Sequence, residues 1–142
     1  MSPEGLRVIG TLGLAALRST AWSISAIGGL TLGADPISFA ISYASATSDN
    51  ALRAFTVRKE AKAHGTGRLI EGPFLAGDHV AITEDVITTG GSAIRAIRAV
   101  QDAGGIVSGV LALVDRMEGG REAITELGVP VVTLVTATDL TS

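Results

Sequence analysis

The chain has 142 residues, of which 46% are apolar and 18% are charged, with a net charge of −3 and no cysteine. This length predicts a single domain over residues 1–142 with a buried core, and the apolar content excludes intrinsic disorder. The lack of cysteine excludes disulfides and thiolate metal sites, and it favours a reducing, cytoplasmic location. The acidic balance and an aromatic content of 4% argue against nucleic-acid binding.

The most apolar N-terminal stretch, residues 6–17, contains Arg7 and is shorter than the roughly 20 residues that cross a membrane. Glu4 precedes it, no basic cluster opens the chain, and no signal-peptidase site follows. We therefore expect an amphipathic helix that packs on the core, and neither a membrane anchor nor a signal peptide.

Strand-like apolar runs alternate with helical patterns along the chain, which predicts a parallel sheet of five strands flanked by helices. The predicted helices are residues 2–18, a helix that begins at Asp35-Pro36, and residues 92–103 and 121–127. The predicted strands are 23–27, 52–57, 79–83, 106–114 and 131–136, with a small hairpin of 69–70 and 74–75. Gly28 and Gly29 are expected to end the first strand, and the continuous apolar content of 106–114 predicts full burial.

Ligands of open α/β sheets bind beyond the carboxyl ends of the strands, where three loops of this chain have unusual compositions. The most informative is AITEDVITTGGSAIRAI, in which Glu84 and Asp85 precede a Thr-Thr-Gly-Gly-Ser segment that opens a helix. Backbone amides at a helix start, with hydroxyls and glycines, form an anion site. The loop lacks the lysine of a Walker A motif and the glycine spacing of a dinucleotide-binding loop.

The two acids would repel a phosphate held alone against them. They would accept hydrogen bonds from sugar hydroxyls or hold a metal ion, so a ribose 5-phosphate fits both halves of the loop. The alternative interpretation is a capped helix preceded by solvated acids.

The second loop, VRKEAKAHGTGR, contains both lysines of the chain, together with Arg58, His64 and Arg68. Clustered cations in an acidic protein indicate an anionic ligand, and the glycines favour a mobile loop. A solvated charged loop is the alternative. The third loop, GGLTLGADP, opens a helix that offers another anion site, although tight packing explains its glycines equally well.

Together, IGGLTLGADPI, AFTVRKEAKAHGTGRLIEG and ITEDVITTGGSAIRAI resemble successive motifs of bacterial orotate phosphoribosyltransferases, from about Ala26 to Arg116. The acid pair with TTGGS is typical of phosphoribosyltransferases in general, and the basic loop is typical of the orotate branch. The resemblance implies a phosphoribosyltransferase-like α/β fold. It also implies Mg²⁺-dependent transfer of 5-phosphoribosyl from phosphoribosyl diphosphate to orotate, which gives orotidine 5′-monophosphate and pyrophosphate in pyrimidine (UMP) biosynthesis.

The resemblance also implies roles for individual residues. Ribose hydroxyls would be held by Glu84 and Asp85, and the 5′-phosphate by Val86, Ile87, Thr88, Thr89, Gly90, Gly91 and Ser92. The pyrophosphate side would be lined by Thr31, Leu32, Gly33, Ala34 and Asp35. The diphosphate would be covered by Arg58, Lys59, Lys62 and His64, and the catalytic set would be Lys59, Lys62, His64 and Asp85. Orotate would contact Thr88 and Arg116.

In this family the mobile loop, here residues 58–68, serves the neighbouring subunit's site, so a homodimer is implied, with Mg²⁺ bound mainly through the substrate. Relatives also carry an N-terminal hood with a lysine and aromatic residues that enclose the base. For this chain the resemblance predicts a shortened hood, because Met1 lies essentially at the first helix and no lysine precedes Lys59. A shortened chain, a misassigned start or an incomplete site would each explain this.

Three alternatives follow: transfer to another base, a regulator that binds nucleotide or RNA without turnover, and an inactive truncated chain. Arg116 favours an anionic base, while the acidic composition and the intact basic loop count against the regulator.

Overall fold

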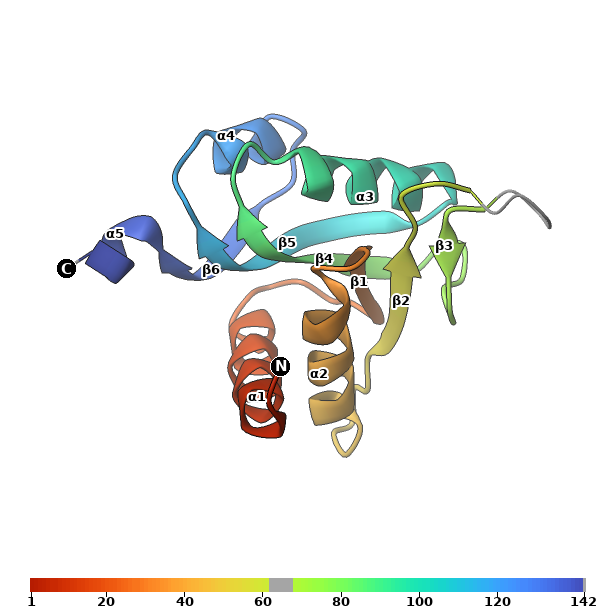
Figure 1. Ribbon diagram of the computed structural model, residues 1–142. Coiled ribbons are helices and arrows are strands. Elements are labelled where there is room, and N and C mark those ends of the chain that lie inside the picture. The colour runs from red at the N-terminus through yellow and green to blue at the C-terminus, as the bar shows by residue number, and fades with distance from the viewer. Residues whose placement is uncertain (62–67, 142) are drawn as a thin grey trace.

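The computed structural model describes residues 1–61 and 68–141. Its middle layer is a six-stranded sheet in the order β3-β2-β1-β4-β5-β6, with α1 and α2 on one face and α3 and α4 on the other (Figure 1). The helices are α1 (Pro3–Arg18), α2 (Asp35–Ser45), α3 (Gly91–Asp102), α4 (Gly120–Thr125) and α5 (Ala137–Thr141). The strands are β1 (Ala26–Leu30), β2 (Arg53–Val57), β3 (Ile70–Glu71), β4 (His79–Ile87), β5 (Ile106–Asp115) and β6 (Val131–Thr136). The predicted α/β class is confirmed, and within the described residues no helix is long and apolar enough to cross a membrane.

The prediction of five strands omitted β3, which pairs antiparallel with β2 through Thr56↔Glu71 and Val57↔Ile70. The predicted hairpin between 69–70 and 74–75 is therefore wrong. The partner of β3 lies on the far side of the basic loop, and a local pattern of two apolar pairs does not reveal a partner at that separation. The other strand pairings are parallel, as expected.

The first strand lies three residues later than predicted, and its two glycines are inside it rather than at its end. A Cβ at Gly28 would lie 2.5 Å from the Phe55 ring, and one at Gly29 would lie 2.3 Å from the Thr83 carbonyl oxygen. Glycine is required here because neighbouring elements approach too closely for a side chain. Tight packing thus accounts for these two glycines.

Further predictions differ from the structure, and the first of these differences affects the site. β4 continues four residues beyond Thr83 to Ile87, so the acid pair lies within the strand. The predicted full burial of β5 is correct for the middle of the strand but wrong for its start. The helices pack over the middle of the sheet and leave Ile106 48% exposed. The last predicted helix is shorter, at Gly120–Thr125, and α5 was not predicted.

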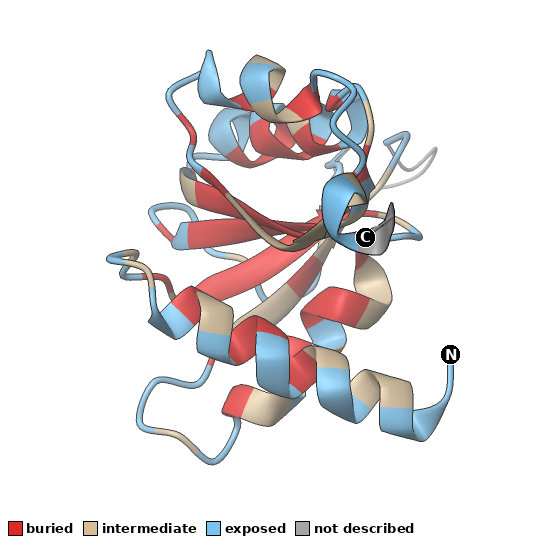
Figure 2. Cartoon of the chain, turned by 90° about the vertical axis from the view of Figure 1, so that its left-hand side faces the viewer, coloured by how far each residue is buried: buried red, intermediate tan, exposed pale blue. Residues whose placement is uncertain are grey.

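The core has two halves, one on each face of the sheet (Figure 2). Val80 and Ile82 of β4 pack in the half that contains α3, whereas Ala81 packs in the half that contains α1 and α2. Because side chains alternate along a strand, this register directs Glu84 toward α3 and Asp85 toward α2. The packing of β4 therefore sends the two acids to opposite faces of the sheet.

The amino edge of the sheet is held by a bidentate ion pair between β2 and the start of β4. Arg53 donates to the two carboxylate oxygens of Asp78 at 2.7 and 3.0 Å. The Arg53 guanidinium holds the pKa of the buried Asp78 carboxyl below its usual value. This clamp lies at the amino ends of the strands, opposite the edge that carries the unusual loops.

Candidate functional site

The acid pair at the end of β4 is the centre of the candidate site. Glu84 is only 7% exposed and lines a cavity of about 280 Å³. The remaining lining residues are Val86, Ile87, Thr88, Thr89, Gly90, Gly91, Ser92 and Arg95. Burial, together with the neighbouring Asp85 carboxylate, raises the pKa of Glu84 to about 8. Glu84 can therefore be neutral near pH 7 and either donate or accept a hydrogen bond.

The start of α3 forms the other wall of this cavity. No side chain caps the helix, so the amides of its first turn have no acceptor within the helix. Gly90 precedes the helix with φ +91, and a Cβ there would lie 3.0 Å from the Gly120 carbonyl oxygen. The chain therefore needs glycine at this turn, and the turn presents amides to an anion. A capped helix after solvated acids does not describe this structure, because the helix is uncapped and Glu84 is buried.

On the opposite face, Asp85 meets the loop that precedes α2. A Cβ at Gly33 would lie 2.9 Å from both carboxylate oxygens of Asp85. In the same loop, the Asp35 carboxylate accepts hydrogen bonds from Thr31 at 2.7 Å and Thr56 at 3.0 Å. The 31–35 loop is thus held between β2 and β4, with the Asp85 carboxylate directly beside it.

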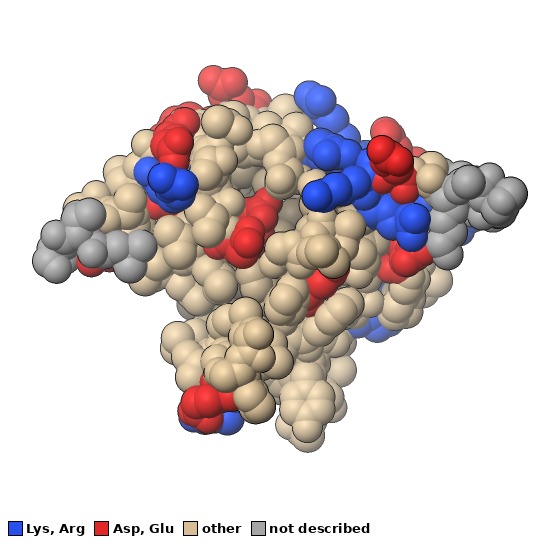
Figure 3. Space-filling view, viewed as in Figure 1, with Lys and Arg blue, Asp and Glu red and all other residues tan. Residues whose placement is uncertain are grey.

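The described part of the basic loop lies beside α3. Arg58 pairs with Glu71 of β3 at 3.1 Å, so its charge is directed toward the edge strand. The side chain of Lys59 is exposed, and its carbonyl accepts a hydrogen bond of 2.7 Å from Arg95. Basic side chains accordingly gather to one side of the acidic ones at the centre of this face (Figure 3). Lys62 and His64 lie outside the described residues.

The predicted orotate contacts stand at the ends of adjacent strands. The amide of Arg116 donates to the Ile87 carbonyl and that of Gly120 to the Thr88 carbonyl, both at 3.0 Å. The loop after β5 is thereby joined to the cavity wall. The Arg116 side chain is exposed and pairs with Glu118 at 3.2 Å, so its guanidinium is available for exchange with another anion.

Arg95 is a site residue that sequence reasoning missed. The helical pattern placed it on the outer face of α3, which is correct, since it is exposed. Its position one turn into the helix also brings it to the cavity and to Lys59. Its position four residues after Gly91 could have indicated this, because a side chain one turn into a helix lies near the anion site at the start of that helix.

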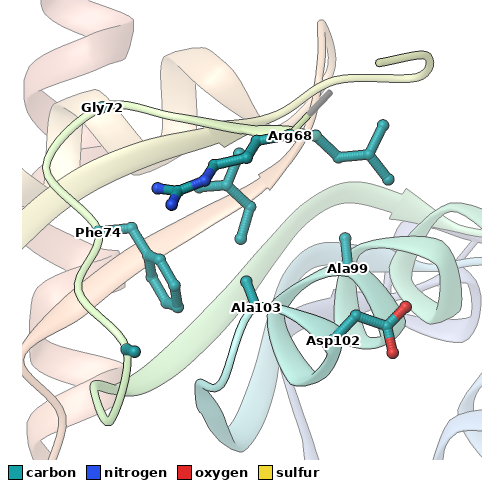
Figure 4. Close-up of a pocket in the computed structure, with 9 residues that line it drawn as sticks. Arg68, Gly72, Phe74, Ala99, Asp102 and Ala103 are labelled. Carbon is teal, nitrogen blue, oxygen red and sulfur yellow. The ribbon is translucent and has the colours of Figure 1, made fainter. Parts of the chain in front are cut away.

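Arg68, by contrast, lies at another cavity. This second cavity, of about 490 Å³, is bounded by the segment around β3 and by the C-terminal half of α3. Figure 4 shows Arg68 extended over it toward Phe74, while Asp102 points away from Phe74. Arg68 therefore lines a cavity at the C-terminal half of α3, whereas the candidate site lies at the start of that helix.

Among the described residues, no three histidine, cysteine or acidic side chains converge as a metal site. The acid pair still provides two carboxylates at the end of β4, Glu84 in the cavity and Asp85 beside Gly33. Mg²⁺ is commonly held by one or two carboxylates together with substrate oxygens and water. The donor set fits a cation that arrives with its ligand better than one held by the protein alone.

No family model matches the chain. Orotate phosphoribosyltransferase of Aquifex aeolicus is 46% identical over 138 residues, which cover 97% of this chain and 74% of the relative. That of Mycobacterium avium is 50% identical over 119 residues, 84% of this chain and 65% of the relative. A crystal structure of Mycobacterium tuberculosis orotate phosphoribosyltransferase in complex with 5-phospho-α-D-ribosyl 1-diphosphate superposes with a TM-score of 0.83 at 41% identity. It covers 95% of this chain and 75% of that one.

Proposed function

The chain belongs to the orotate phosphoribosyltransferase family, and we infer that it transfers 5-phosphoribosyl from phosphoribosyl diphosphate to orotate. The products are orotidine 5′-monophosphate and pyrophosphate, as in pyrimidine (UMP) biosynthesis, and a cytoplasmic location accords with the cysteine-free sequence. One observation carries this function. The acid pair of β4 stands between the uncapped start of α3 on one side and the 31–35 loop on the other.

Each part of phosphoribosyl diphosphate has a matching surface in this arrangement. The 5′-phosphate would accept hydrogen bonds from the first-turn amides and from hydroxyls of the 88–92 segment. The ribose hydroxyls would donate to Glu84 and Asp85. The diphosphate would lie along the 31–35 loop, close to Lys59. Binding in this orientation would place the anomeric carbon at the edge of the sheet, between the start of α3 and the 31–35 loop.

The reaction breaks the bond between C1 of ribose and the diphosphate oxygen, while a ring nitrogen of orotate bonds to C1. Positive charge develops on the ribose and negative charge on the leaving pyrophosphate. The Asp85 carboxylate would stabilise the first, and Lys59, with the predicted Lys62 and His64, the second. As it bonds to C1, the ring nitrogen loses its proton to the basic oxygens of the departing pyrophosphate or to solvent, so the chain itself needs no strong base.

We propose that Mg²⁺ accompanies the substrate and that Asp85 is the carboxylate that faces it. The support is the donor set, two carboxylates at the end of one strand beside a cavity for an anion. The ion supplies positive charge to the diphosphate oxygens. Thr88 and Arg116 would bind the orotate end, with Arg116 exchanging Glu118 for the orotate carboxylate.

A homodimer is proposed as the working form. A hollow of about 750 Å³ between α1 and α2 is lined mainly by apolar residues. At its rim Tyr43 is 85% exposed and Phe39 is 50% exposed. Exposed aromatic residues in an apolar hollow are typical of a protein interface. In such a dimer the 58–68 loop would reach the partner's site.

The function is tested by incubating the chain with phosphoribosyl diphosphate, Mg²⁺ and equal concentrations of orotate, uracil and hypoxanthine. We expect orotidine 5′-monophosphate to be the main nucleotide formed, and formation to stop when Mg²⁺ is removed. A main product from another base would identify a different acceptor. Binding of phosphoribosyl diphosphate without any product at high protein concentration would contradict catalysis by this chain.

A further inference from the structure

A pair of buried hydroxyls lies directly beneath the acid pair. Ser38 of α2 is fully buried and Thr83 of β4 is 1% exposed. Their hydroxyl oxygens are 2.7 Å apart. Both also lie near the carbonyl oxygen of Ala34, at 3.1 Å from Ser38 and 3.4 Å from Thr83. The two hydroxyls therefore connect β4 to the residue that precedes α2.

Two hydroxyl protons cannot serve three oxygen pairs at once. The shorter distances favour a relay in which Thr83 donates to Ser38 and Ser38 donates to the Ala34 carbonyl. That carbonyl also accepts the Ser38 amide at 3.0 Å. In this arrangement both hydroxyls have hydrogen-bond partners, so the pair leaves no unsatisfied polar group in the core.

The two hydroxyls connect the surface that would hold the ribose with the surface that would hold the diphosphate. Thr83 immediately precedes Glu84 and Asp85. Ala34 belongs to the pyrophosphate-side loop, where Gly33 lies so close to Asp85 that a Cβ would be 2.9 Å from its carboxylate oxygens. A Cβ at Gly29 would lie 2.3 Å from the Thr83 carbonyl oxygen and 2.6 Å from Cβ of Ala34, so the two segments are already packed closely.

We propose that Ser38 and Thr83 are positioning residues that set the spacing between the acid pair and the 31–35 loop; this rests on the proposed function. The bond that breaks lies between the groups held by these two surfaces. A shift of Ala34 relative to β4 would therefore misalign the diphosphate with the ribose while leaving each surface intact. Misalignments of about 1 Å can cost as much as 100-fold in rate.

The inference is tested with Thr83→Val, which keeps the side-chain shape and removes the hydroxyl, and with Ser38→Ala. We expect each to lower the affinity for phosphoribosyl diphosphate or kcat by about tenfold. Affinities for ribose 5-phosphate and pyrophosphate, measured separately by calorimetry, should stay within about twofold because each fragment touches one surface. Thr83→Ser retains the hydroxyl and should restore activity.

Ser45→Ala is the matched control, since Ser45 is a second fully buried and hydrogen-bonded serine of α2, at the helix end away from the site. It should lower Tm without changing kcat or ligand affinity. Wild-type behaviour of both Thr83→Val and Ser38→Ala, or equal losses for the fragments and the whole substrate, would overturn the inference alone. A wild-type chain that binds no phosphoribosyl diphosphate would overturn the proposed function and the inference together.

Discussion

Asp85 is the residue on which ribose recognition depends most directly. Its carboxylate stands between the cavity loop and Gly33, and it accepts a hydrogen bond from the Val86 amide at 2.8 Å. Asp85→Asn keeps the volume and removes the charge. We expect a loss of roughly 10- to 100-fold in affinity for phosphoribosyl diphosphate, because hydrogen bonds to a charged acceptor are the stronger ones.

Isothermal titration calorimetry measures this loss. Asp102→Asn provides the control, since it removes the same charge from an exposed position on α3. Unchanged affinity in the Asp85 variant would count against contact between this carboxylate and the sugar.

Glu84 should make the stability of the unliganded protein depend on pH. Its pKa is 4.5 without perturbation and about 8 in the fold, chiefly because of burial. Between these values the unfolded chain releases the proton and the folded chain keeps it. The free energy of unfolding therefore falls as pH rises from about 4.5 to 8, by at most about 1.4 kcal/mol per pH unit, and then levels off.

Glu84→Gln removes this contribution. Urea denaturation across that pH range should show a shallower decline for the variant and a higher stability than wild type at pH 8. Parallel curves for the two proteins would mean that Glu84 is ionised in the fold at neutral pH.

At the scale of elements, the segment that follows β2 supplies the positive charge. Lys59 is exposed, and its side chain makes no hydrogen bond or ion pair within residues 1–61 and 68–141, so its removal should change stability by less than about 0.5 kcal/mol. Lys59→Ala should nevertheless lower kcat by about 10- to 100-fold, because charge on the departing pyrophosphate loses its partner. Steady-state kinetics and thermal melts measure the two effects.

Arg98→Ala, which removes an exposed cation from α3, should change neither property. A fall in Tm that parallels the fall in kcat for Lys59→Ala would indicate a structural role for the lysine instead.

Sequence patterns predicted some elements well and others poorly, for identifiable reasons. β6 has the predicted bounds because an apolar run is closed by Pro130 on one side and by polar residues on the other. β4 was ended too early, because its apolar run stops at Thr83 while its backbone pairing with β5 continues to Ile87↔Asp115. This backbone pairing includes the acids in the strand, and it cannot be predicted from the residue types of β4 alone.

The candidate site was likewise predictable only in part from the sequence. The motifs marked which residues belong to it, and the structure places 84 and 86–92 on one cavity. The separation of Glu84 and Asp85 onto opposite faces, and the close approach of Gly33 to Asp85, needed the register of β4. Arg95, Ser38 and Thr83 were missed, since their roles arise from packing between helices and the sheet.

At the scale of the whole molecule, a dimer with exchanged loops makes a quantitative prediction. Lys62→Ala damages the loop and Asp85→Asn damages the sugar site. If the loop of one subunit serves its partner, a mixed dimer has one site with both defects and one intact site. Random mixing of equal amounts should therefore restore about a quarter of wild-type activity.

Activity of the mixture is compared with that of each variant alone, after dimers have been allowed to exchange. Sedimentation of Tyr43→Glu tests the interface itself, because a charge in the α1–α2 hollow should favour the monomer. Mixed activity equal to the mean of the two variants, with dimers shown to exchange, would mean that each loop serves its own subunit.

The central claim is that this sheet edge holds a phosphorylated sugar between the start of α3 and the 31–35 loop. A crystal structure of the chain soaked with phosphoribosyl diphosphate and Mg²⁺ tests it most directly. We expect the 5′-phosphate on the amides of Gly91 and Ser92, the ribose hydroxyls on Glu84 and Asp85, and the diphosphate along residues 31–35. Electron density for the ligand elsewhere on the molecule, or its absence at saturating concentration, would contradict the account.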